Sequence, residues 1–72
     1  MKKYAVVLEK AVSNWATYVP DLPGCVATGA TLEETLRLIA GAIEFHIEGM
    51  RLHGEQDPEP TAIAGTVEIS AA

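Results

Sequence analysis

The sequence predicts a single α+β domain of two layers, with elements in the order β-β-β-α-β over residues 1–72. Two observations carry this prediction. Three short runs rich in apolar, β-branched or aromatic residues precede residue 30, as expected of an antiparallel three-stranded meander. A longer stretch after residue 31 has apolar residues at helical spacing, so one helix is expected to cover one face of the sheet.

The first strand is expected at about residues 2–10, where Tyr4–Leu8 is apolar on both alternating faces. A strand of this kind is normally covered on both sides. Ser13 and Asn14 indicate a hairpin turn before the second strand.

The second strand is expected at about residues 14–19. Alternation places Trp15, Thr17 and Val19 on one face and Ala16 and Tyr18 on the other. At most one of the two aromatic side chains can therefore pack against the helix.

A rigid bend is predicted between the second and third strands, because Pro20 and Pro23 fix φ and remove backbone donors. Asp21 favours a turn, and Gly24 can adopt a positive φ. The third strand is then expected at about residues 24–29.

The helix is predicted at about residues 32–53. Thr31 and Glu34 form a capping box at its start, and Gly54 is a natural stop. Its main apolar stripe consists of Leu32, Leu36, Ile39, Ala40, Ile43, Ile47 and Met50. A second stripe lies nearly opposite, and we expect it to mediate self-association; it consists of Leu38, Phe45 and Leu52.

The remaining sequence predicts a polar linker at residues 54–62, rich in proline and acid, and a short fourth strand at about residues 65–70. The tail at residues 70–72 is expected to be frayed.

Composition narrows the function classes. Of the 72 residues 49% are hydrophobic, and the mean hydropathy of +0.17 favours a homo-oligomer. The net charge of −5 argues against direct nucleic-acid binding and suits a basic protein partner. A single cysteine, Cys25, excludes an internal disulfide. We find no pattern of a signal peptide or a membrane span, and we expect a cytoplasmic protein with no membrane partner.

Candidates for chemistry are few. Glu9, Glu44 and Glu68 could gather as a Mg²⁺ site, although solvated charges are the simpler interpretation. His46 and His53 are two helical turns apart, about 10 Å, which is too far to share a metal ion without other ligands. Cys25 has no basic residue near it in sequence and is expected to be a buried thiol. We therefore expect no enzyme and no cofactor.

The order of these motifs resembles the HicB antitoxin family over about residues 4 to 60. The resemblance rests on Tyr4–Glu9, Trp15–Tyr18, the block Val19-Pro20-Asp21-Leu22-Pro23-Gly24-Cys25, the pattern Gly-x-Thr-x-x-Glu at residues 29–34, the helical run Ala42–Met50 and the linker Gly54–Pro60. It implies a fold like a reduced ribonuclease H domain, a homo-oligomer, and a small basic HicA-type toxin that cleaves messenger RNA. The antitoxin would cover the active surface of that toxin. With only 72 residues, a short form without the family's C-terminal DNA-binding domain is expected.

Two alternatives stay open: an orphan relative that is an oligomeric binding or structural protein, and a degenerate Mg²⁺-dependent nuclease using the three glutamates. For the antitoxin, we expect the partner-binding residues to lie near the bend, where aromatic anchors meet a carboxylate able to pair with Arg or Lys. These residues are Trp15, Tyr18, Asp21 and Leu22.

Overall fold

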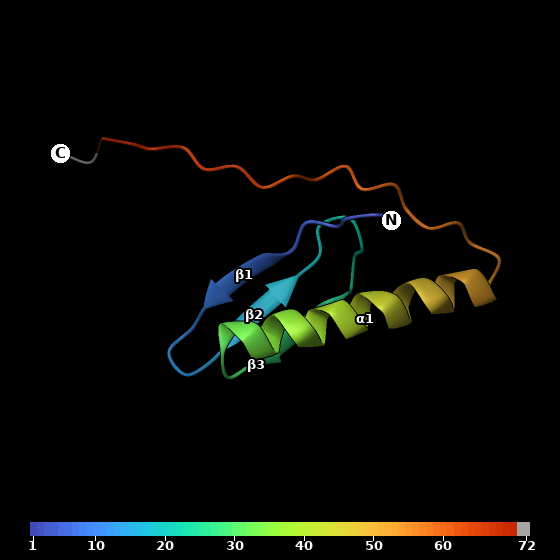
Figure 1. Cartoon of the computed structure of the whole chain (residues 1–72), viewed down its shortest axis with the longest axis horizontal. Helices are drawn as coiled ribbons and strands as arrows, with labels where there is room; N and C mark the ends of the chain where they lie inside the picture. The colour runs from blue at the N-terminus through green and yellow to red at the C-terminus, as the bar shows by residue number, and fades with distance from the viewer. Residues whose placement is uncertain (71–72) are drawn as a thin grey trace.

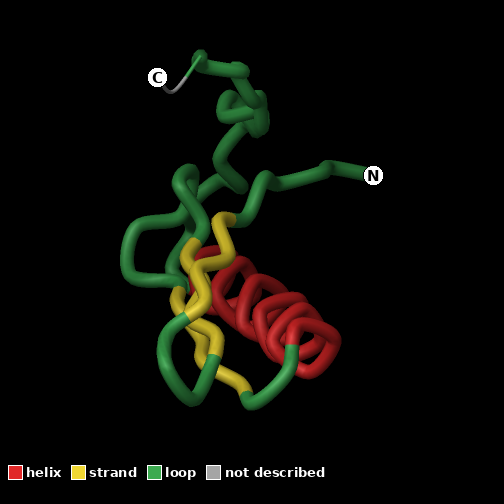
Figure 2. The backbone as a smooth tube through the Cα atoms, turned by 90° about the vertical axis from the view of Figure 1, so that its left-hand side faces the viewer, coloured by secondary structure: helices red, strands yellow, loops and turns green. Residues whose placement is uncertain are grey.

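The computed structural model describes residues 1–70 and has one sheet and one helix (Figure 1). The elements are β1 (Val7–Lys10), β2 (Trp15–Tyr18), β3 (Val26–Gly29) and α1 (Leu32–Leu52). The strands are antiparallel in the order β1-β2-β3, and Figure 2 shows the helix on one side of them. The predicted α+β fold is confirmed, whereas the fraying expected at residues 71–72 lies outside the described residues.

The register separates two faces of the sheet. Tyr18 on β2 lies opposite Val7 on β1 and Val26 on β3. The neighbouring residues Thr17 and Val19 are buried under the helix, whereas Tyr18 is 44% exposed. The alternation expected along this strand is therefore present, and one face of the sheet is left open.

The bend supplies most of the buried core, which consists of Val19, Leu22, Cys25 and Ile39. Two consecutive β-turns build it: the Leu22 amide donates to the Val19 carbonyl (3.0 Å), and the Cys25 amide donates to the Leu22 carbonyl (3.1 Å). In the second turn Gly24 has φ +86°, as predicted, at the position where a type II turn requires a positive φ. The turns point Leu22 and Cys25 inward against the helix.

The helix ends follow local rules. Thr31 Oγ1 accepts a hydrogen bond from the Glu34 amide (3.1 Å), and the Glu34 carboxylate accepts one from the Ala30 amide (3.4 Å). At the other end Gly54 has φ +76°, and its amide and that of Glu55 bond back to carbonyls of the last helical turn.

The fourth strand expected at residues 65–70 does not form within residues 1–70. The chain beyond Gly54 is extended and crosses the N-terminal segment, but it pairs with none of the three strands (Figure 1). Polar contacts hold residues 57–62 against the rest of the domain at the end of the sheet, and the following residues lead away from it. Residues 65–70 therefore have the sequence pattern of a strand, but no strand of the described chain pairs with them.

Candidate partner-binding surface

The four residues predicted to bind a partner do not form one surface. Leu22 is 1% exposed and belongs to the core, so its prediction as a surface anchor is wrong. Trp15 is half-buried on the helix side of the sheet, and Tyr18 is exposed on the opposite side. Strand alternation thus separates Trp15 from Tyr18, and the bend turns Leu22 into the core.

Asp21 is occupied by the chain's own C-terminal segment. Its carboxylate accepts hydrogen bonds from the Thr61 hydroxyl (2.6 Å), the Thr61 amide (3.0 Å) and the Ala62 amide (3.1 Å). These bonds, foremost the one from the Thr61 hydroxyl, lower the pKa of Asp21 because they stabilise the ionised form. The carboxylate expected to pair with a partner instead anchors a segment 40 residues away in the sequence.

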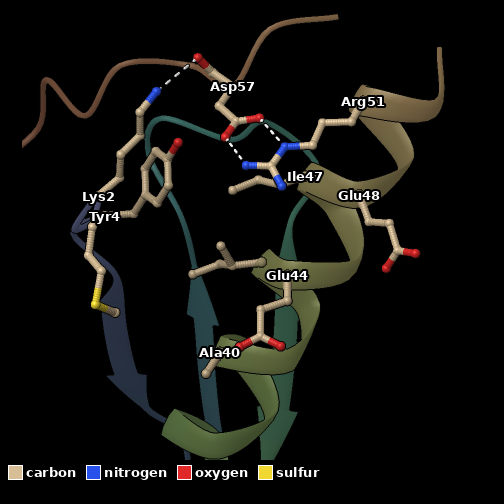
Figure 3. A pocket seen from close by; sticks show the side chains of 10 residues that line it. Lys2, Tyr4, Ala40, Glu44, Ile47, Glu48, Arg51 and Asp57 are labelled. Carbon is tan, nitrogen blue, oxygen red and sulfur yellow. Dashed lines mark hydrogen bonds and ion pairs between the residues drawn. The ribbon is translucent and has the colours of Figure 1, made fainter. Parts of the chain in front are cut away.

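Three further contacts hold residues 57–59, which lie between the end of α1 and the two residues bound to Asp21. Arg51 donates to both carboxylate oxygens of Asp57, and this bidentate pairing lowers the pKa of Asp57. The Tyr4 hydroxyl donates to the Pro58 carbonyl (2.6 Å), and Lys2 pairs with Glu59 (3.0 Å). Figure 3 shows Lys2, Tyr4, Arg51 and Asp57 around one end of a cavity.

The open face of the sheet carries an apolar row across all three strands. Val7, Tyr18 and Val26 lie side by side in the register, with Tyr18 44% and Val26 63% exposed. Glu9 occupies the next row on the same face and is exposed. An aromatic side chain flanked by aliphatic residues, with a carboxylate nearby, is suited to bind a basic protein.

Sequence reasoning missed Val7 and Val26 as members of this surface. Their shared face follows only from the register, which pairs both with Tyr18. Alternation along β2 predicts on which face of the sheet Tyr18 lies. It does not predict which residues of β1 and β3 lie opposite Tyr18.

The second helical stripe is exposed, as a contact surface requires. Leu38 is 46% exposed, and Phe45 and Leu52 are each 80% exposed. It lies on α1 away from the buried Ile39, and within the described chain Phe45 and Leu52 are largely uncovered.

The residues considered as candidates for metal binding or catalysis do not form a site in the described chain. Within residues 1–70, no three His, Cys, Asp or Glu side chains are placed to hold a metal ion, so the alternative in which Glu9, Glu44 and Glu68 gather as a Mg²⁺ site has no support in the geometry. Cys25 is buried, and burial raises the pKa of its thiol, which opposes a role as nucleophile. Among the described residues, no helix is both long enough and apolar enough to span a membrane.

Comparison with known proteins identifies relatives along nearly the whole chain. Residues 4–70 match the family described as the HicB-like antitoxin of bacterial toxin-antitoxin systems. An uncharacterised 14.9 kDa protein of Haemophilus phage HP1 is 40% identical over 60 residues, covering 83% of this chain and 45% of the phage protein. A UPF0150 protein of Thermoplasma acidophilum is 38% identical over 66 residues, covering 90% of this chain and 96% of that protein.

A UPF0150 protein of Helicobacter pylori is 44% identical over 41 residues, covering 57% of each chain. The chain therefore spans about half the length of the phage and Helicobacter relatives and nearly all of the Thermoplasma relative.

Proposed function

The chain belongs to the HicB-like antitoxin family, and from this premise we propose that it neutralises a small basic mRNA-cleaving toxin of the HicA type by protein contact. The observation that carries the proposal is the family match over residues 4–70, which includes the sheet, the bend and the helix. The site of action would be the cytoplasm, where messenger RNA is cleaved.

The open sheet face is the surface that best suits the toxin. It offers Tyr18 as an aromatic anchor between Val7 and Val26, and Glu9 as a carboxylate for an Arg or Lys of the partner. The net charge of −5 would speed the encounter with a basic protein, so association should slow as salt rises. In this proposal Trp15, Asp21 and Leu22 stabilise the fold, and of the four predicted residues Tyr18 alone contacts the toxin.

The helix stripe Leu38-Phe45-Leu52 is proposed as the self-association surface of the same protein. Its exposed apolar side chains lie on α1, apart from the open sheet face, so a homo-oligomer could bind toxin on each copy. The orphan, purely oligomeric alternative rests on this same stripe. The nuclease alternative loses its geometric basis, because its three glutamates do not form a metal site within residues 1–70.

The test is coexpression with a small basic toxin of the HicA type, taken from the gene next to that of this chain if one is encoded there. The wild-type chain should co-purify with that protein and relieve its toxicity, and Tyr18→Lys should abolish both effects. Glu9→Lys should weaken the complex by about tenfold, since it puts a positive charge against a basic partner.

Glu55→Lys is the matched control, because Glu55 is an exposed linker residue with the same change in charge. If Glu55→Lys weakened binding as much as Glu9→Lys, the loss would be a nonspecific effect of net charge and would not place Glu9 in the interface. Full toxin binding by Tyr18→Lys would remove the open face from the interface. RNA hydrolysis by the purified chain, lost in Glu9→Gln, would overturn the antitoxin assignment.

A further inference from the structure

The C-terminal segment has the pattern of a strand but no sheet within residues 1–70. Ile63, Val67 and Ile69 lie at alternating spacing and are 92%, 84% and 81% exposed. Thr66 and Glu68 point to the other side of an extended chain of this register. An apolar face of this length, held in water on an extended chain with unpaired backbone groups, is suited to add to the edge of a sheet.

The same chain presents a groove that such a strand could cover. A cavity of about 730 Å³ runs between α1 and the segment that leads into β1 (Figure 3). Tyr4, Ile43 and Ile47 give it an apolar lining, and Glu44 and Glu48 belong to its polar rim. Residues of the segment 1–4 line one side of the groove and lead into β1, and because β1 is an edge strand its outer backbone groups are unpaired.

Residues 63–70 follow directly after an anchored stretch of the chain. Asp57 is held by Arg51 at one end of the groove, and Asp21 holds Thr61 and Ala62 on the bend. Residues 63–70 leave the domain from that point, as Figure 1 shows for the orange and red part of the chain. In this structure residues 63–70 therefore lie away from the groove of their own chain.

We propose that residues 63–70 of one copy add as a strand to the free edge of β1 in a second copy, with Ile63, Val67 and Ile69 covering the groove there. The occupant is a second copy because every chain carries both the exposed segment and the groove. In a two-fold exchange, the segment of each copy is paired and the groove of each copy is covered. A foreign strand in the groove would instead leave the segments of residues 63–70 in water. This inference does not depend on the toxin.

The decisive experiment is nuclear magnetic resonance on a mixture of isotope-labelled and unlabelled chains, filtered for contacts between copies. We expect contacts between the methyl groups of Val67 or Ile69 in one copy and Tyr4 or Ile47 in the other. The amides of residues 64–70 should exchange at least about tenfold more slowly than in an unpaired chain, and the slowing should increase with protein concentration.

Val67→Lys should abolish the contacts between copies and the slow exchange, without unfolding the domain, because Val67 is 84% exposed. Thr66→Lys is the matched control, since its side chain lies on the opposite side of the strand, and it should retain both signals. Phe45→Glu should also retain them, which separates this contact from the helix stripe. Contacts found only within one copy, or amides of residues 64–70 that exchange freely at high concentration, would overturn the proposal.

Discussion

Gly29→Ala tests how closely the sheet approaches the helix. A Cβ atom at Gly29 would lie 2.5 Å from Thr35 Oγ1, 3.0 Å from Thr35 N and 3.2 Å from Thr35 Cα. Thr35 is fully buried, and its hydroxyl already donates to the Thr31 carbonyl at 2.7 Å. The methyl group could therefore be accommodated only if α1 moved away from β3 or if a buried hydroxyl lost its partner.

The expected cost follows from two opposing effects. Overpacking of this kind costs about 1–3 kcal/mol. Replacing glycine by alanine where the backbone permits it recovers about 0.4–1 kcal/mol through the unfolded chain. The net loss should be on the order of 1–2 kcal/mol, a large fraction of the roughly 4–10 kcal/mol expected for a chain of this size.

Two matched glycines isolate the cause. Gly41 lies in α1, and a Cβ atom added there would have no neighbour within 4 Å, so Gly41→Ala should stabilise the domain by about 1 kcal/mol through helix propensity. Gly24 is equally open but has φ +86°, so Gly24→Ala should cost about 1–2 kcal/mol from backbone strain alone. The three variants share one chemical change but differ in its physical effect.

Urea unfolding followed by circular dichroism, at a fixed protomer concentration, measures all three changes, because association would otherwise shift the apparent stability. Stability of Gly29→Ala equal to or above that of the wild type, with Gly41→Ala stabilised as expected, would refute the close approach of β3 and α1.

Two further predictions concern the anchor and the stripe. Because the pKa of Asp21 is lowered by the Thr61 and Ala62 hydrogen bonds, the anchor should be fully present above the ordinary aspartate range and lost as pH falls through the lowered pKa. Amide chemical shifts of Thr61 and Ala62 should report this loss on acid titration, and Asp21→Asn should remove the titration; an unchanged titration in Asp21→Asn would contradict the assignment. Phe45→Glu should weaken assembly through the helix stripe by about tenfold in sedimentation, while Arg37→Glu, an exposed charge change on another side of α1, should not. A wild-type chain that sediments as a monomer at micromolar concentration would refute self-association.

The features predicted correctly from the sequence depend on short-range partners. The Thr31 cap bonds a residue three positions away, and Gly54 closes the helix within its own last turn. Gly24 needed a positive φ because the prolines around it already fixed a turn. Propensities and spacing detect such interactions because both partners lie within one or two turns of chain.

The incorrect predictions at the candidate site have longer-range causes. Leu22 was expected on the surface because it stands in a proline-rich bend, yet the two turns direct it inward to meet Ile39 on the helix. The row Val7-Tyr18-Val26 could not be found without the strand register, and the choice between a cluster of Glu9, Glu44 and Glu68 and separate solvated charges needed the distances between them. None of these quantities is contained in a local window of sequence.

Asp21 illustrates how helix length decides the role of a distant residue. With 21 residues α1 is roughly 30 Å long at 1.5 Å per residue, whereas β3 spans four residues, about 13 Å. The helix starts just after β3 and runs back past it, so its C-terminal end extends beyond the bend. The chain that turns at Gly54 must therefore pass the end of the sheet where Asp21 lies. A carboxylate there accepts hydrogen bonds from the backbone amides of Thr61 and Ala62, and beyond this anchor residues 63–70 lead away from the domain.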